Sequence, residues 1–265
     1  MKAEKQVLPS TIAIFCDRQE VENVFPGHGS TAVQTEVYTQ WVIEDKFATD
    51  FPDLTKVGVV ISDDIGPYEE TKIRILNGGH TSLAYIGVLS GYTTFDQVMN
   101  DPSHRKHFKQ LQRDEIAPSI DTELPFDVYD YIDTVEERFS DATNVDELDR
   151  ICMDGFTKFH TFVVPSLRKC LEQGKRPIHI YKSIVAWYIY SRRFARGCTK
   201  IRYDEPNWTL LEPLLRDGAV DAFVCSERLW GDIPKTYITF TRDLKSLLLS
   251  QTYEKEIDLL TEMST

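Results

Sequence analysis

Four polar residues of the kinds that do acid–base chemistry lie close together between Pro67 and Gly91. They are Glu69, Lys72, Asn77 and His80. If this segment is an α-helix, about 100° per residue places Asn77 about 140° and His80 about 80° around the axis from Lys72, with Glu69 about 60° away. The spacing therefore predicts that all four side chains share one face of a helix.

That face is apolar rather than solvated. It also carries Ile73, Leu76 and Leu83, whereas Thr71, Arg74 and Gly78 lie elsewhere or at its margin. A lysine buried among leucines tends to have a lowered pKa, which a general base working near neutral pH requires. Periodicity alone leaves another interpretation open, because a structural ion pair between Glu69 and Lys72, with Asn77 and His80 bonded locally, would fit the same pattern.

The elements that must position these residues are mostly helices. Pro67 and an acidic first turn begin the helix that carries them, and Gly91 ends it. Before it, residues 11–16, 37–47 and 57–62 are rich in β-branched and aromatic residues and predict strands, the first and last of them buried. The predicted fold is mainly α, with a strand and loop segment over residues 1–66 and a helical catalytic or substrate-binding domain over residues 67–265.

Further helices are predicted after the first one. Their ranges are 94–99, 103–116, 125–139, a helix that starts at Asn144 and includes Arg150, 158–171, 178–194, 208–215, 223–230, 243–249 and 253–262. An interruption at 154–155, between Arg150 and Lys158, is left open. His104 and His107 lie three apart on the second of these, a spacing that could hold a metal, but no acidic or thiolate ligand stands at a matching position. We therefore predict an exposed helical face there and no metal site.

Composition excludes several classes of protein. The 42 acidic and 30 basic residues give a formal charge of −12 without a basic run, which argues against a nucleic-acid or anionic-membrane surface. No apolar run approaches the roughly 20 residues that span a bilayer. The 5 cysteines are scattered and lack a C-x-x-C pair, so reduced thiols and a cytoplasmic location are predicted.

The array KIRILNGGH, with its K-x4-N-x2-H spacing, resembles the polyol-specific long-chain dehydrogenases, the family of mannitol 2-dehydrogenase and of fructuronate and tagaturonate reductases. Other segments resemble the same family and occur in the family's order. They are CDR at 16–18, TQWVIEDKF at 39–47, KVGVVISDDIGPYE at 56–69, and the later ERFSD and PSLR. The resemblance thus covers most of the chain and implies a C-terminal dehydrogenase domain.

The resemblance also implies roles for particular residues. Lys72 would take the hydroxyl proton as general base, Asn77 would stabilise the developing alkoxide, and His80 would bind a neighbouring hydroxyl. Glu69 would relay the proton to solvent. DRICMDGFTK matches the family's R-x7-K pair, so Arg150 and Lys158 become candidates for binding the substrate, although composition alone would make them surface cations.

The cofactor implied by the resemblance is NAD or NADP, and this sequence contains no G-x-G-x-x-G after a predicted strand. Asp17 is the candidate cofactor contact on this chain. We expect the dinucleotide-binding region to lie outside the chain, with the strands of residues 1–66 completing its sheet. A second hypothesis from another class is a non-catalytic module that binds sugar or docks on a separate nucleotide-binding chain.

Overall fold

The computed structural model describes residues 13–15, 33–35, 38–143, 145–198 and 202–250. The predicted helix at 253–262 and the cofactor candidate Asp17 lie outside these ranges. The mainly α fold is confirmed, since the described part consists largely of helices with a few short strands near the N-terminus. None of the described helices is long and apolar enough to cross a membrane.

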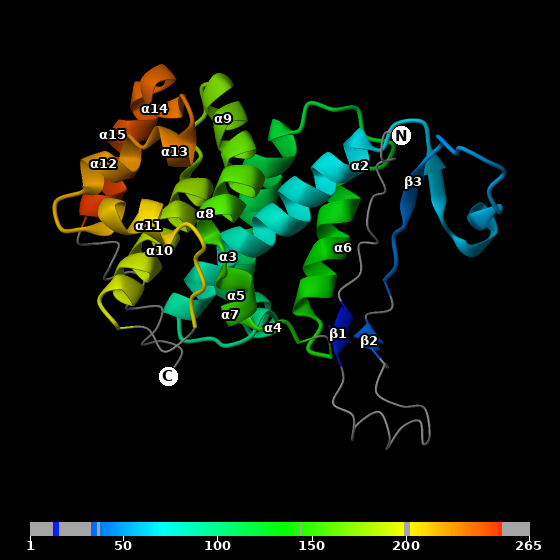
Figure 1. Ribbon diagram of the computed structural model, residues 1–265, viewed down its shortest axis with the longest axis horizontal. Helices are drawn as coiled ribbons and strands as arrows, with labels where there is room; N and C mark the ends of the chain where they lie inside the picture. The colour runs from blue at the N-terminus through cyan, green and yellow to red at the C-terminus, as the bar shows by residue number, and fades with distance from the viewer. Residues whose placement is uncertain (1–12, 16–32, 36–37, 144, 199–201, 251–265) are drawn as a thin grey trace, which may run out of the picture.

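The first strands form two separate pairs. β1 (Ala13–Phe15) runs antiparallel to β2 (Val33–Thr35), and β3 (Val42–Glu44) runs parallel to β4 (Val60–Ser62) with Val42 opposite Val60. A short 3-10 turn, η2 (Leu54–Val57), precedes β4. β3 lies beside α2 at one end of the molecule, away from the C-terminal helices at the other end (Figure 1).

The helices follow in one continuous series. The α-helices are α2 (Gly66–Thr71), α3 (Gly78–Leu89), α4 (Phe95–Asn100), α5 (Pro102–Gln110), α6 (Val128–Ser140), α7 (Leu148–Cys152), α8 (Gly155–Lys158), α9 (Val164–Glu172), α10 (Ile178–Ala195), α11 (Trp208–Leu211), α12 (Val220–Val224), α13 (Glu227–Trp230), α14 (Ile233–Thr236) and α15 (Ile238–Leu249). Three π-helical segments, η3 (Lys72–Asn77), η4 (Leu111–Ile116) and η6 (Phe159–Val163), and two 3-10 turns, η5 (Ala117–Ser119) and η7 (Glu212–Leu215), lie between them.

Local chemistry sets where several helices begin. Asp101 accepts hydrogen bonds from the backbone N–H groups of Ser103 (2.8 Å) and His104 (3.1 Å) at the start of α5. Asp127 accepts one from the N–H of Tyr129 (2.7 Å) at the start of α6. Carboxylates at these positions satisfy N–H groups that have no partner inside the helix, so the acidic residues of these segments serve partly as caps.

The hydrophobic core is centred on α3, which packs against α10 and α7. Its side chains are buried on nearly every side, and aromatic rings from α10 fill the space beyond it, with Trp187 stacked on Phe159 at a centroid distance of 4.6 Å. The prediction of a helix with one apolar face was therefore too narrow. Thr71, Arg74 and Gly78, which were placed off the apolar face, are also buried.

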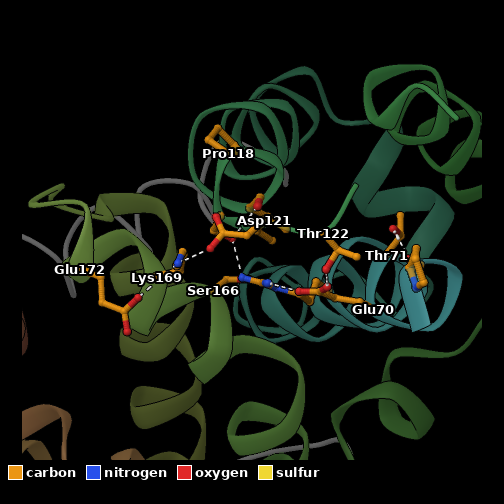
Figure 2. A network of polar contacts seen from close by, with 12 residues as sticks. Glu70, Thr71, Pro118, Asp121, Thr122, Ser166, Lys169 and Glu172 are labelled. Atoms are coloured by element: carbon orange, nitrogen blue, oxygen red, sulfur yellow. Dashed lines mark hydrogen bonds and ion pairs between the residues drawn. The ribbon is translucent and has the colours of Figure 1, made fainter. Parts of the chain in front are cut away.

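Arg74 is buried in this way because a polar network satisfies its guanidinium. It donates to Ser166 through Nε (3.0 Å), to Ser119 (2.7 Å) and to the carboxylate of Glu70 (2.5 Å), which also accepts from Thr122. Figure 2 shows three of these residues, Glu70, Thr122 and Ser166, close to one another. This network joins α2 and η3 to α9 and η5. It therefore holds the helix that carries the candidate site against its neighbours.

Candidate functional site

The segment that carries the candidate base is a π-helical turn inside a longer helix. From Gly66 to Leu89 the helix is continuous, but over Lys72–Asn77 the pairing changes, and the N–H of Gly78 reaches the carbonyl of Ile73, five residues back. In a π turn the hydrogen bond spans five residues, so residues five apart lie closer around the helix axis than they do in an α-helix. Lys72 and Asn77 are five apart, so the π turn reduces the angle of about 140° that separates them on an ideal α-helix.

The π turn is held by a neighbouring helix. Gln112, in the π segment η4, donates from Nε2 to the carbonyl of Ile75 at 2.8 Å. It can approach because Gly79 has no side chain: a Cβ there would lie 2.1 Å from the Gln112 Nε2. Gly79 and Gln112 together therefore support the backbone between Lys72 and Asn77.

Lys72 is less deeply buried than the apolar face predicted. Its side chain is half-buried, and burial lowers its pKa, with the positive charge of Arg138 acting in the same direction and Glu69 opposing it. Within the described residues Lys72 makes no ion pair, so the structural pair with Glu69 that the spacing allowed does not form. Glu69 itself is exposed.

Asn77 is half-buried at the end of the π turn. Its side-chain amide makes no hydrogen bond with any residue that the structure describes. A half-buried amide without a protein partner retains its donors for a ligand, which is what stabilisation of an oxyanion requires.

His80 lies one turn further along, in an aromatic clamp. Its ring stacks on Phe139 at a centroid distance of 4.8 Å and meets the edge of Phe95 at 4.2 Å. Burial lowers its pKa to about 4, an effect that Asp146 opposes and that the charges of Arg150 and Lys158 reinforce. The imidazole is therefore neutral at physiological pH.

Arg150 and Lys158 both lie near His80, as their influence on its pKa shows. Arg150 is 63% exposed and pairs with the buried carboxylate of Asp146, while the Lys158 ammonium donates to the carbonyl of Ile151 at 2.8 Å. Burial and Arg150 both lower the pKa of Lys158. The chain leaves the helical conformation between α7, which carries Arg150, and α8, which carries Lys158. Both cations nevertheless lie near His80.

The break between α7 and α8 positions Lys158. Asp154 adopts a left-handed conformation (φ 52°), and the backbone N–H of Phe156 donates to the buried Glu205 at 2.9 Å. A side chain at Gly155 would meet the Tyr85 hydroxyl at 2.4 Å, so the chain can turn there only with glycine. Glu205 is thus a supporting residue that sequence reasoning did not find, because it lies 49 positions away from Phe156.

The site residues form two groups that α6 connects. Glu69 acts on the charge of Lys72 in one group, and Arg150 and Lys158 act on His80 in the other. Two consecutive residues of α6 each act on one group. The charge of Arg138 acts on Lys72, and the ring of Phe139 stacks on His80. Arg138 and Asp146 were both missed from the sequence. The spacing of Asp146 and Arg150, four apart, was the one local signal that could have found Asp146.

The prediction of an exposed histidine face on α5 was wrong. His104 is buried, lies 2.9 Å from the Asp101 carboxylate and 3.0 Å from the Ser90 hydroxyl. His107 meets His179 of α10 with 3.1 Å between the two Nδ1 atoms. These rings pack between helices, and within the described ranges no group of three or more His, Cys, Asp or Glu residues could hold a metal ion.

Comparisons with known proteins agree on one family. Residues 64–248 match the family model of the mannitol dehydrogenase C-terminal domain. The chain is 31% identical over 239 residues to mannitol 2-dehydrogenase of Phaeosphaeria nodorum, covering 88% of this chain and 42% of that protein. It is 35% identical over 208 residues to mannitol dehydrogenase 2 of Saccharomyces cerevisiae, covering 77% of this chain and 40% of that protein.

Solved structures agree with these matches. The ternary complex of Pseudomonas fluorescens mannitol 2-dehydrogenase with NAD and D-mannitol superposes with a TM-score of 0.79 and 26% identity, covering 96% of this chain and 54% of that one. A substrate-free D-sorbitol dehydrogenase has the same fold, with a TM-score of 0.82 at 23% identity. The chain spans about half the length of these proteins or less. From the family match and the identities to the curated relatives, this chain belongs to the mannitol dehydrogenase family and carries its C-terminal domain.

Proposed function

We propose that this chain supplies the catalytic and substrate-binding side of an NAD(P)-dependent dehydrogenase that interconverts a polyol or sugar acid with its ketose. The observation that carries the proposal is Lys72, which is half-buried, free of an ion pair among the described residues, and in one π turn with Asn77, whose amide has no hydrogen-bond partner among those residues. The lowered pKa of Lys72 supports the role of a base.

In this mechanism Lys72 accepts the proton of the reacting secondary hydroxyl as the C–H hydride leaves. Asn77 donates a hydrogen bond to the oxygen as negative charge develops on it, and Glu69, exposed beside Lys72, passes the proton to solvent. His80, Arg150 and Lys158 bind the other hydroxyls and so orient the reacting carbon. The nicotinamide cofactor, when bound, accepts the hydride.

The described residues fit the substrate side of such a site better than the cofactor side. They contain no strand, glycine-rich turn and helix in the order that holds a dinucleotide, and β3 and β4 are the one parallel pair among them. The choice between NAD and NADP therefore belongs to residues beyond this helical part, and Asp17 stays a candidate cofactor contact from sequence alone.

The test is the substitution Lys72→Met, which removes the base but keeps an unbranched apolar side chain. NADH formation by the protein from D-mannitol and NAD should fall by about 100-fold or more, the usual contribution of general base catalysis. Thermal unfolding should show that the variant is folded. Turnover at the wild-type rate in a folded Lys72→Met protein would remove Lys72 from the mechanism.

One observation favours a second candidate, a non-catalytic module that docks on a separate nucleotide-binding chain. Several large apolar residues near the parallel strands are exposed; they are Trp41, Phe51, Val57 and Val60. The same assay separates the candidates. A module would bind polyol without forming NADH until a nucleotide-binding chain is added, whereas an enzyme forms NADH when only NAD and polyol are supplied.

A further inference from the structure

We propose that Asp146 is a positioning residue that makes the site select uncharged polyols over sugar acids. This inference rests on the proposed function and deepens it. Four observations carry it: the burial of the Asp146 carboxylate, its two-point pairing with Arg150, its closeness to His80, and the way the backbone fixes it.

The Asp146 carboxylate is held rigidly at the site. Its side chain is 8% exposed, and Oδ1 accepts from Arg150 through Nε at 2.9 Å and Nη2 at 2.6 Å, while Oδ2 contacts the same guanidinium. Its carbonyl accepts from the N–H of Phe95 at 2.9 Å, next to an isolated antiparallel bridge between Thr94 and Glu147. A carboxylate anchored in this way cannot swing out of the site.

Arg150 therefore meets a ligand as half of an ion pair. A free guanidinium would bind a carboxylate at two points and favour a sugar acid. With a buried partner already occupying Nε and Nη2, the charge of Arg150 is largely compensated, and a second carboxylate would face Asp146 as a like charge. The pair retains donors that a neutral hydroxyl can use.

Asp146 also directs the imidazole of His80. Its Oδ2 lies 3.6 Å from the buried Nε2, which has no hydrogen-bond partner among the described residues. The nearby negative charge favours the tautomer that carries its proton on Nε2, so Nδ1 is the nitrogen that remains for a ligand as an acceptor. A hydroxyl can donate to that nitrogen and an ionised carboxylate cannot, which discriminates in the same direction as the ion pair.

Asp146→Asn tests the inference because it removes the charge and keeps the shape. In the full protein, kcat/KM is measured for D-mannitol and for D-mannonate, in which a carboxylate replaces one terminal hydroxymethyl group. The ratio of the two values should shift toward mannonate by about tenfold or more. Glu147→Gln makes the same chemical change at the exposed neighbouring residue and should leave the ratio as in wild type.

An equal fall for both substrates in Asp146→Asn would overturn the inference, since a merely structural carboxylate would act on both alike. If this variant does not fold, Arg150→Gln decides the question, because the Arg150 side chain is exposed and its removal leaves Asp146 uncompensated. The ratio should then shift toward mannitol, and an unchanged ratio would refute the role of the pair. If the wild-type protein oxidises neither substrate, the proposed function falls first and this inference falls with it.

Discussion

At the scale of single residues, the central requirement is a lysine that gives up its proton more easily than a lysine in water. Burial and the charge of Arg138 meet this requirement at Lys72, and Glu69 works against them. Because the neutral amine is the form that accepts a proton, alcohol oxidation should increase with pH as Lys72 loses its own proton. The midpoint of that increase reports the balance of these charges.

Glu69→Gln changes this balance in a predictable direction. Removing a negative charge that raises the pKa of Lys72 should shift the midpoint of kcat/KM against pH to a lower value. The measurement is the rate of NADH formation from D-mannitol across the alkaline range. Glu123→Gln is the matched control, since Glu123 is exposed and does not act on Lys72, and it should leave the midpoint in place. A midpoint that moves upward in Glu69→Gln would contradict the electrostatic account.

The sequence predicts the residues within one helix better than the residues that reach them from elsewhere. A lowered pKa could be predicted for Lys72 because helical periodicity places it among apolar neighbours, although its side chain is half-buried rather than buried. Arg138 and Asp146 could not, because each approaches from another element, and no spacing within residues 67–91 reports which side chains face that helix. The roles of Lys72, Asn77, His80, Glu69, Arg150 and Lys158 remain predictions until variants are assayed.

At the scale of elements, the feature that matters most is the π turn, and it is the one that periodicity could not show. Pro67 and Gly91 predicted the extent of the helix well, since α2 begins at Gly66 and α3 ends at Leu89. The change of register within it depends on Gln112, which is 37 positions from the carbonyl that it binds. A long-range hydrogen bond of this kind leaves no local pattern in the sequence.

A double-mutant cycle tests whether Gly79 and Gln112 support the turn together. A Cβ at residue 79 would displace the Gln112 amide, so Gly79→Ala should lower the free energy of unfolding by about 1–3 kcal/mol, the cost of leaving the Ile75 carbonyl unpaired with some overpacking. In a Gln112→Ala background the same change should cost less, because the amide is already gone. Strictly additive losses in urea unfolding would show that the two residues act independently.

The error at His104 and His107 also belongs to this scale. Three-residue spacing on a polar helix was interpreted as an exposed face, since histidine is a polar side chain and the sequence around it is charged. In the fold α5 packs between neighbouring elements, and Asp101, Ser90 and His179 supply partners that make burial of these rings acceptable. A helix with polar residues can be buried where its partners are polar as well.

At the scale of the whole molecule, the strands near the N-terminus are less buried than their sequence predicts. Residues 57–62 were predicted as a buried strand, but Val57 is exposed, the strand shortens to Val60–Ser62, and Val60 is partly uncovered. Parallel strands are normally covered on both faces. Among the described residues, Val57 and Val60 leave the parallel pair β3–β4 incompletely covered. That these strands complete a dinucleotide-binding sheet stays a prediction from the family resemblance. The division of the chain at residue 66 stays a prediction.

Burial of a neutral histidine should make the stability of the whole molecule depend on pH, with a lower free energy of unfolding in acid. Burial lowers the pKa of His107 to about 3, with the charges of His179, Lys182 and His104 acting in the same direction. The unfolded chain therefore binds more protons than the folded chain between about pH 6.5 and pH 3, so stability falls as the pH falls through this window. From pH 7 to pH 5 the loss due to His107 is about 2 kcal/mol.

Glu115 has the opposite effect on the pH dependence of stability, so the experiment must distinguish its contribution from that of His107. Burial raises its pKa to about 7, although it accepts hydrogen bonds from the N–H groups of His179 and Ile180, so its contribution grows as the pH falls from 7 toward 4.5. His107→Asn removes the contribution of His107 and leaves those of Glu115 and of the other histidines in place. Urea unfolding at pH 7 and pH 5 should then show a loss of stability about 2 kcal/mol smaller than in wild type. His160→Asn makes the same substitution at an exposed residue, and an equal effect of both substitutions would contradict the assignment to a buried histidine.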